Sequence, residues 1–411
     1  MNSGDKLPLF TGFGVEIEYA IVDKETLQVL PIVEQIFKEI SGTQTSEYID
    51  GDICFSNELT SHVMELKTNG PAKSLETAVC GFQKSIQKLA AVLRAKKAIL
   101  LPTGAHPFMD PLRHTVLWPY ANKEIYESFD RIFGCQGHGW SNLQSTHLNL
   151  PFANEEEFIK LHAAIRILLP IIPALSASTP ILEGKITGYK DTRLEIYRKN
   201  QQKIPSICGD VIPESIGSIE EYKTIILKKM YNDISPYDPL GVLQDEWLNS
   251  RGAIARFERN TVEIRIIDTQ ECVLSDLAIL EFIIRVLKDL VNEKWATLAD
   301  YQTFSTKNLV KTFLHVIEQG SDVFIYDQDY LKLFGYNKGV GCSIRELWRF
   351  LKEKYFQEKE LFFEPLSTIT NHGNLAERII RMLDGEYSQD KIKDLYSRLG
   401  FCLYENKPLT F

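Results

Sequence analysis

The segment "TGFGVEIEYAIVD" (Thr11–Asp23) combines an apolar strand pattern with two carboxylates. Successive side chains of a strand point to opposite faces, so Glu16 and Glu18 share one face. The other face carries apolar residues, namely Val15, Ile17 and Tyr19. A strand with one wet face would explain this pattern. A pair of carboxylates placed to hold a cation would explain it equally well, and the later strands must distinguish the two.

The composition is that of a globular protein. The chain has 411 residues, of which 44% are hydrophobic and 25% charged, which is enough for a large core. Its length alone favours two or three domains, although this is a weak guide. The net charge is −9, and we find no long run of Lys and Arg. This balance argues against general nucleic-acid binding.

The cysteines and the apolar stretches indicate the cellular compartment and whether the chain crosses a membrane. The seven cysteines are scattered singly without a CxxC pair, which argues against a disulfide framework or a zinc ribbon. The first residues, "MNSGDKLPLF", lack the charged and apolar regions of a signal peptide. No apolar stretch reaches the roughly 20 residues that a membrane span needs. We therefore expect a cytoplasmic protein with no membrane association.

Alternation and helical spacing predict an α+β fold with a mostly antiparallel sheet. The segment 179–215 is rich in Pro, Gly and charge and predicts a long ordered functional loop. Strands are predicted at residues 13–22, 61–68 and 145–152, in the buried segment "AILLPTG" (98–104), which ends in a loop, and at two places within 253–270 around Asn260. Helices are predicted at 31–40 (with Pro31 at its start), at 72–97, at 155–178 (broken by its prolines) and almost throughout after Ser275.

Three later segments repeat the pattern of polar side chains on an apolar strand. They are "NELTSHVMELKT" with Glu58 and Glu65, "STHLNLP" with His147 and Asn149, and "VEIRIID" with Glu263, Arg265 and Ile267 on one face. Glu58 and Glu65 are separated by an odd number of residues. In an unbroken strand they would point to opposite faces, so their cooperation requires a bend or bulge.

Each of these groups alone would be unremarkable as a solvated side chain or a structural histidine. Together, converging carboxylates would be unfavourable unless cations neutralised them. Oxygen-rich, thiol-free ligation favours Mg²⁺ or Mn²⁺ over zinc, and Mg²⁺ held by carboxylates and phosphates is usual in nucleotide chemistry. The sequence contains no P-loop, HExxH or GxSxG motif.

The order of six motifs resembles the glutamate–cysteine ligase family of the bacterial carboxylate–amine ligase type, within the glutamine-synthetase-like superfamily. The motifs lie between about residues 12 and 275: "GVEIEY", "E…VMELKT", "PTGAHPF", "THLNLPF", "ALSASTPILEGKITGYKDTR" and "RFERNTVEIRIIDT". The resemblance implies a funnel of antiparallel strands flanked by helices. It also implies one catalytic domain (1–411), with a ligase core at 10–275 and a helical portion at 276–411 packed on it.

The resemblance also implies roles for individual residues. Arg265 and Arg193 would be catalytic, with Arg265 facing the phosphates or the carboxylate substrate. His147 would lie near metal and nucleotide. Arg193, Thr68 and Asn149 would bind substrate. The metal ligands would be Glu16, Glu18, Glu58, Glu65 and Glu263.

The implied reaction uses ATP and Mg²⁺ (or Mn²⁺) to phosphorylate a carboxylate, expected to be the γ-carboxyl of glutamate. Cysteine or another amine then attacks the acyl phosphate. Two departures from the family pattern leave alternatives open: Asp191 and Thr192 precede Arg193 where relatives read Ser-Tyr, and Leu148 and Asn149 follow His147 where many read "HVHVG". The alternatives are a nucleotide- or amino-acid-binding relative without ligase activity and a metal-dependent amide hydrolase.

Two further features remain expectations. The aromatic residues before His147 are predicted to pack in the core rather than to line an acceptor pocket. They are Trp118, Tyr120, Tyr126 and Trp140. Related enzymes often form dimers or tetramers, so a homo-oligomer is among the partners considered, but the sequence does not determine the oligomeric state.

Overall fold

The computed structural model describes residues 6–410. Residues 1–5 belong to the N-terminal segment for which no signal peptide is predicted, and they lie outside the described residues. Residue 411, the last residue of the predicted 1–411 domain, also lies outside them.

One antiparallel sheet of eight strands dominates the structure, which confirms the predicted α+β class. Seven strands run in the order β2-β3-β4-β1-β6-β10-β9, and β5 pairs with the far end of β1. The strands are β1 (Gly14–Asp23), β2 (Glu47–Asp50), β3 (Ile53–Asn57), β4 (Val63–Thr68), β5 (Ala98–Leu101), β6 (Ser145–Pro151), β9 (Ala253–Arg256) and β10 (Thr261–Asp268). Two small hairpins lie apart from this sheet: β7 (Ile181–Leu182) with β8 (Lys185–Ile186), and β11 (Phe324–Ile325) with β12 (Cys342–Ser343).

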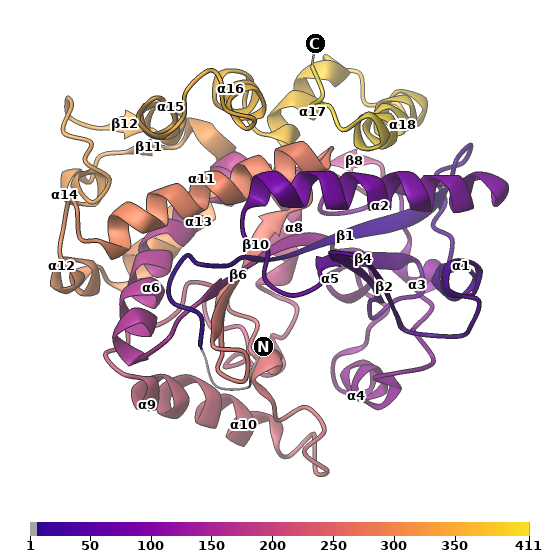
Figure 1. Ribbon diagram of the computed structural model, residues 1–411, viewed down its shortest axis with the longest axis horizontal. Helices are drawn as coiled ribbons and strands as arrows, with labels where there is room; N and C mark the ends of the chain where they lie inside the picture. The colour runs from indigo at the N-terminus through magenta and orange to yellow at the C-terminus, as the bar shows by residue number, and fades with distance from the viewer. Residues whose placement is uncertain (1–5, 411) are drawn as a thin grey trace.

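The helices surround this sheet (Figure 1). In the first half of the chain they are α1 (Val33–Ser41), α2 (Leu75–Ala95), α3 (Pro111–His114), α4 (Lys123–Phe133), α5 (His138–Ser141), α6 (Glu155–Leu168), η1 (Leu169–Ile171), α7 (Pro173–Ser176) and α8 (Thr192–Tyr197). The middle of the chain adds α9 (Ile219–Tyr222), η2 (Lys223–Lys228), α10 (Lys229–Ile234), η3 (Glu246–Leu248) and α11 (Val273–Val291). The remainder are α12 (Leu298–Thr303), α13 (Thr306–Gln319), η4 (Gly320–Asp322), α14 (Gln328–Lys332), α15 (Ile344–Tyr355), α16 (Phe363–His372), α17 (Leu375–Leu383) and α18 (Gln389–Glu405).

Most predicted elements are present, with four corrections. Pro31 does not start the first helix, which begins at Val33 after Ile32. The edge strand β2 and its neighbour β3 were not predicted. The segment 179–215 is less irregular than expected, since it contains β7, β8 and α8. A register shift between Ile264 and Ile267 interrupts the strict alternation predicted for β10.

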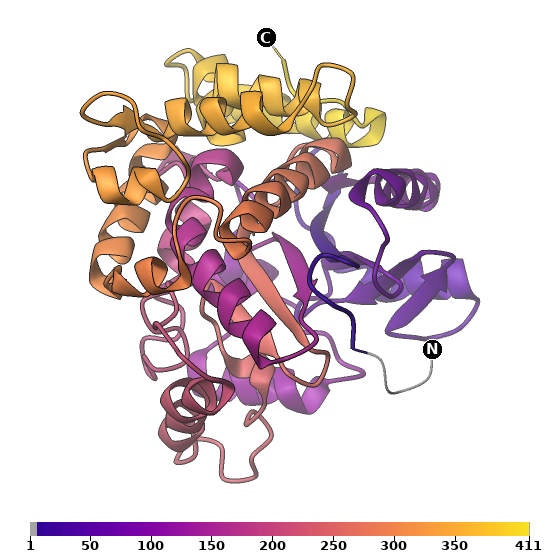
Figure 2. The same ribbon diagram turned by 60° about the vertical axis from the view of Figure 1, so that its left-hand side comes forward.

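The apolar face of the sheet is covered by helices. Val15, Ile17 and Tyr19 are fully buried, as the alternation predicts. Three helices, α2, α6 and α11, pack together and against strands on this side. Figures 1 and 2 show α11 between the sheet and the C-terminal helices. Since this face is closed, the polar side chains of β1 must project to the other side.

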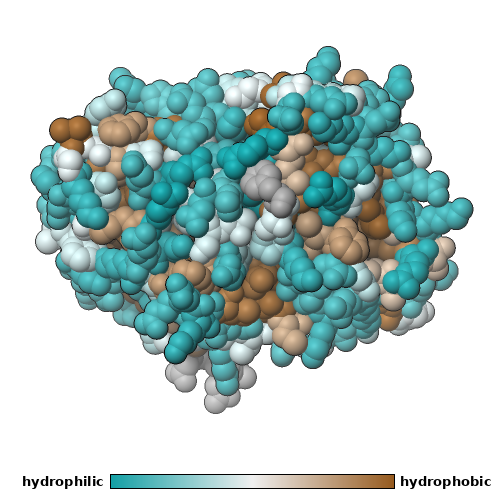
Figure 3. Space-filling model, turned by 90° about the horizontal axis from the view of Figure 1, so that it is seen from above, coloured by the Kyte–Doolittle hydropathy of each residue, from teal (hydrophilic) through white to brown (hydrophobic). Residues whose placement is uncertain are grey.

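The last two helices complete a second, smaller core at one end of β1. Residues of α17 and α18 pack with Ala20, Val22 and Leu101. An ion pair of 2.7 Å between Arg378 and Glu271 lies in the interior, with both side chains almost fully buried. The outer face over these helices is mainly hydrophilic, with separate apolar patches (Figure 3).

All seven cysteines are free thiols. Within residues 6–410, no helix combines the length and the apolar character that crossing a membrane requires.

Candidate active site

Strand register brings the predicted site residues together on the open face of the sheet. Glu16 of β1 lies opposite Lys67 of β4 on one side and opposite His147 of β6 on the other. Glu18 lies opposite Glu65. Directly opposed side chains in an antiparallel pair have Cβ atoms about 4.5–5.5 Å apart, so their end groups can interact.

Glu18, Glu58 and Glu65 form an acidic triad. One carboxylate oxygen from each lies within 4.8 Å of the others. Glu58 follows the last residue of β3, in the loop to β4, so the chain turns between Glu58 and Glu65. This turn meets the predicted requirement for a bend and lets both carboxylates face the same point.

Few positive groups neutralise the acidic triad. Lys67 lies 3.4 Å from Glu65 and is the one lysine or arginine within ion-pair distance of the triad in the part of the chain described here. Ser56 donates a hydrogen bond to Glu65, and the backbone N–H of Ser145 donates one of 2.8 Å to Glu18. Three clustered carboxylates with one cationic partner therefore carry an excess of negative charge.

The pKa values of two triad members reflect this excess. Burial and the charge of Glu16 raise the pKa of Glu65 to about 7, although Lys67 opposes the shift. Burial together with the charges of Glu18 and Glu65 raises the pKa of Glu58 well above its usual range. A divalent cation would remove this repulsion, and three carboxylate oxygens are ligands that Mg²⁺ or Mn²⁺ accepts. The donor set therefore fits the predicted metal.

A second cluster consists of Glu16, His147 and Glu263, with ligand atoms that also lie within 4.8 Å of one another. The Nδ1 atom of His147 is 3.0 Å from Glu16, and its Nε2 atom is 2.9 Å from the hydroxyl of Ser145. Burial alone would raise the pKa of Glu16, but the hydrogen bond and charge of His147 lower it to about 2. This carboxylate is thus ionised and paired within the protein.

Two arginines flank Glu263. Arg265 Nε lies 2.9 Å from one carboxylate oxygen of Glu263, and Arg256 Nη1 lies 3.4 Å from the other. Arg256 also forms an ion pair of 2.6 Å with Glu258 at the surface. The second cluster is therefore better neutralised by the protein than the acidic triad is.

Arg193 is buried close to β10 rather than free in a loop. It lies in α8, and its Nη1 atom is 3.4 Å from Asp268. Its Nη2 atom donates a hydrogen bond of 2.9 Å to the backbone carbonyl of Arg265. Arg193 lines the cavity described below, and these contacts tie α8 to the strand that carries Glu263 and Arg265.

The two predicted polar contacts, Asn149 and Thr68, have partners within the sheet. Asn149 donates a hydrogen bond of 3.2 Å to Glu16. Gly14 lies opposite Asn149, and a Cβ atom at Gly14 would come within 2.9 Å of the Cβ of Asn149. The hydroxyl of Thr68 accepts a hydrogen bond of 3.2 Å from the backbone N–H of Val15. Both side chains line a cavity at this end of the sheet.

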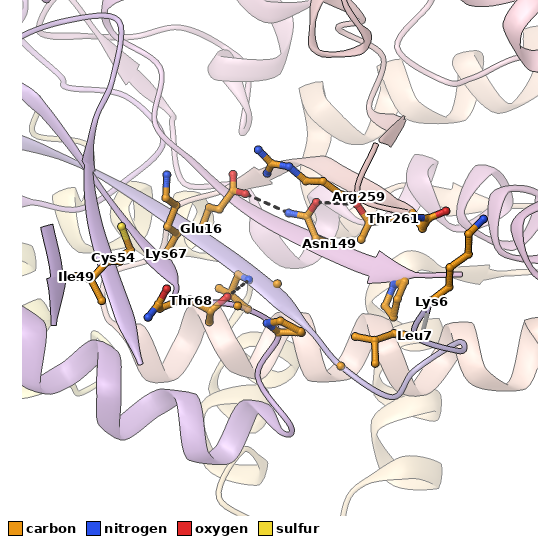
Figure 4. Close-up of a pocket in the computed structure, with 18 of the residues that line it drawn as sticks. Lys6, Leu7, Glu16, Ile49, Cys54, Lys67, Thr68, Asn149, Arg259 and Thr261 are labelled. Carbon is orange, nitrogen blue, oxygen red and sulfur yellow. Dashed lines mark hydrogen bonds between the residues drawn. The ribbon is translucent and has the colours of Figure 1, made fainter. Parts of the chain in front are cut away.

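Two cavities meet along this polar face. The edge cavity, about 700 Å³, is lined by Glu16, Thr68 and Asn149 and by the N-terminal segment from Lys6. In Figure 4, Glu16 and Lys67 project to the same side of the sheet within it. The inner cavity, about 610 Å³, contains the acidic triad, His147, Arg193 and Arg265. Lys67 and Arg259 line both cavities and mark the passage between them.

The aromatic residues before His147 divide into two groups. Trp118 is buried in the core as predicted, whereas Tyr120 is exposed, so its prediction as a core residue is wrong. Trp140 is half-buried and lines the inner cavity, so its prediction is also wrong. Tyr126 packs against the core as predicted and also lines the inner cavity. Tyr126 belongs to α4 and Trp140 to α5, and no local pattern in the sequence indicates that these helices line the cavity.

Several residues of the site were not assigned a role from sequence. Lys67 shares its strand face with Glu65, and this alternation could have identified it. Ser56 belongs to an unpredicted strand, and Arg256 lies on the partner strand of β10. Their roles depend on pairing between strands, which the sequence does not show.

Comparison with known proteins identifies the family and the fold. The glutamate-cysteine ligase family 2 (GCS2) model matches residues 12–398. An uncharacterized protein of Archaeoglobus fulgidus is 34% identical over 394 residues, which are 96% of this chain and 99% of that protein.

Two solved structures share the fold. The glutamate–cysteine ligase of Francisella tularensis in complex with AMP has a TM-score of 0.64 at 13% identity, covering 97% of this chain and 89% of that one. A bifunctional glutathione synthetase from Pasteurella multocida has a TM-score of 0.53 at 13% identity, covering 96% of this chain and 53% of that one. The sheet is thus of the glutamine-synthetase-like type, and the chain belongs to glutamate–cysteine ligase family 2.

Proposed function

We propose that the protein is an ATP- and Mg²⁺-dependent carboxylate–amine ligase that activates the γ-carboxyl of glutamate. The observation that carries this proposal is the acidic triad of Glu18, Glu58 and Glu65, which has one cationic partner and faces a cavity. Membership of the family supports the reaction class. The AMP in the related Francisella tularensis structure supports a nucleotide as co-substrate.

In this proposal the edge cavity takes the nucleotide and the inner cavity takes the carboxylate and the amine. Lys67 and Arg259 border both cavities, so their cationic groups suit a triphosphate that passes from one to the other. Glu18, Glu58 and Glu65 would hold one Mg²⁺, and Glu16, His147 and Glu263 a second. Bound Mg²⁺ would neutralise phosphate charge and polarise the phosphorus–oxygen bonds.

The protein's own groups serve positioning and charge stabilisation. A carboxylate oxygen of the substrate attacks the terminal phosphorus, the bond to ADP breaks, and an acyl phosphate forms. The amine nitrogen then bonds to the acyl carbon, phosphate leaves with the electron pair of the C–O bond, and the nitrogen loses a proton. Arg265, held by Glu263 and the carbonyl of Asn249, is placed to stabilise the transferring phosphoryl group.

The other residues predicted from the sequence would bind substrate or position the groups that do. Arg193 would bind substrate from the wall of the inner cavity while it holds β10 through the carbonyl of Arg265. Asn149 would orient Glu16, and Thr68 would border the nucleotide.

The test is a single-acceptor assay. Purified protein is incubated with ATP, MgCl₂ and glutamate, with hydroxylamine as a small trapping amine. The expected products are ADP and γ-glutamyl hydroxamate in equal amounts. Glu58→Gln should abolish both, whereas Glu127→Gln, an exposed glutamate of α4, should not. ATP binding without either product would instead support a non-ligase relative, and amide cleavage without ATP would support a hydrolase.

A further inference from the structure

One part of the lining of the inner cavity is aromatic. It is built by Tyr126 and Phe129 of α4, Trp140 of α5 and Trp247 of η3. Phe129 lies between the two tryptophans, and its ring centroid is 4.8 Å from that of Trp140 and 6.0 Å from that of Trp247. All four side chains are half-buried rather than buried. Phe133 stacks on Trp140 with ring centroids 5.5 Å apart and covers one face of that indole, so only the remaining exposed parts of the four side chains can meet a molecule in the cavity.

This aromatic wall begins beside the acidic triad. The hydroxyl of Tyr126 accepts a hydrogen bond of 3.2 Å from Asn57, the residue before Glu58. Burial, and next the charge of Glu58, raise the pKa of Tyr126. A molecule lying on the aromatic wall would thus have one end at Glu58, where the proposed activated carboxylate is formed.

A cysteine acceptor does not account for these features. In the proposed reaction the inner cavity of about 610 Å³ holds glutamate as well as the amine, so its aromatic lining, and not its volume, distinguishes between acceptors. Cysteine has a single thiol beyond its Cβ and offers no broad surface to the rings. Aromatic rings prefer flat apolar partners, and their faces also attract ammonium groups.

We propose that the acceptor is an amine bearing an aromatic ring or a comparably broad flat apolar group, which stacks on Phe129, Trp140 and Trp247 with its nitrogen directed to Glu58. This inference rests on the proposed ligase function. The reaction is otherwise unchanged: the amine nitrogen bonds to the acyl carbon, phosphate departs with the C–O electron pair, and one proton is released.

The experiment compares two amines that differ in one ring. With ATP, MgCl₂ and glutamate, amide formation is measured with 2-phenylethylamine, ethylamine and cysteine. We expect kcat/KM for 2-phenylethylamine to exceed both others by about tenfold or more, as burial of a ring allows. Equal values for the two amines, or a preference for cysteine, would overturn the inference while hydroxamate formation keeps the ligase proposal intact.

Two variants and a binding measurement complete the test. Trp140→Ala should reduce the ratio between 2-phenylethylamine and ethylamine to near one, and Trp140→Phe should retain part of it. Trp295→Ala, an exposed tryptophan outside the aromatic wall, is the matched control and should keep the wild-type ratio. Trp247→Leu repeats the test if Trp140→Ala does not fold.

If no hydroxamate forms, the ligase proposal fails first. Saturation-transfer NMR of 2-phenylethylamine then decides the remaining claim: binding that Trp140→Ala removes supports recognition by the aromatic wall, and absence of binding overturns it.

Discussion

Glu18 and Glu65 lie opposite each other on β1 and β4, and Glu58 brings a third carboxylate within 4.8 Å of both. Like charges this close raise one another's pKa unless a cation neutralises them. The three carboxylates therefore leave an excess of negative charge on the open face of the sheet, and Lys67 neutralises only part of it.

This excess negative charge predicts that Mg²⁺ stabilises the folded protein and that the stabilisation depends on pH. The pKa of Glu65 is raised from 4.5 to about 7 in the folded protein. The stability that the protonated Glu65 carboxyl contributes is therefore complete below pH 4.5 and is lost as pH rises through 7. A shift of this size corresponds to at most about 3 kcal/mol in the free energy of unfolding. Since Mg²⁺ competes with protons, saturating MgCl₂ should raise Tm more at about pH 8 than at about pH 6.

Differential scanning calorimetry with and without MgCl₂ measures this effect. Glu58→Gln should remove most of the difference between the two pH values, and Glu127→Gln should leave it unchanged. Equal stabilisation at both pH values would show that Mg²⁺ does not bind the acidic triad.

A second prediction concerns Glu263, which holds two arginines. Glu263→Gln removes the ion pairs with Arg265 and Arg256 and frees the guanidinium groups to reorient. We expect kcat/KM for ADP formation to fall by about 10²–10³, the loss typical of removing one stabilising donor. Glu258→Gln is the matched control because Glu258 also pairs with Arg256 but is half-exposed. Similar losses in the two variants would contradict the role given to Arg265.

A third prediction tests the close approach of Gly14 to Asn149. In Gly14→Ala the new methyl group would meet the Cβ of Asn149 at 2.9 Å, so Asn149 must move and its hydrogen bond to Glu16 must lengthen. We expect a loss of about 1–3 kcal/mol in unfolding free energy, as for other overpacked sites. Gly137→Ala adds a methyl group into open space and should change stability little. Urea denaturation of both variants compares the two sites directly.

A fourth prediction concerns the buried ion pair beneath the C-terminal helices. Arg378→Ala leaves Glu271 without its partner in the interior and removes hydrogen bonds to the carbonyls of Gly373 and Leu409. The expected cost is about 3–5 kcal/mol. Arg113→Ala, at an exposed pair with Asp110, should cost far less. Chemical denaturation of the two variants gives the comparison, and similar costs would show that the buried pair contributes no more than a surface one.

The local patterns of the chain predicted much of the sheet. Alternation in β1, β4 and β6, and in β10 up to its register shift after Ile264, placed the polar residues on the open face, because the twofold period of a strand is a property of its own backbone. The strands β2 and β3 were not predicted. Glu47 and Asp50 give β2 a mostly exposed surface, whereas β3 is buried on both faces, so neither shows the alternation of a half-buried strand.

The sequence by itself determined which side chains are polar on apolar strands, and through its motifs it determined the family. Only the tertiary structure decided which of the carboxylates among them are neutralised by cationic side chains. The acidic triad has Lys67 as its one cationic partner among the described residues, while Glu263 is held between two arginines, and Trp140 lines a cavity instead of the core. These outcomes depend on strand register and on helices far apart in the chain, and such long-range pairing is set by the packing of the whole fold.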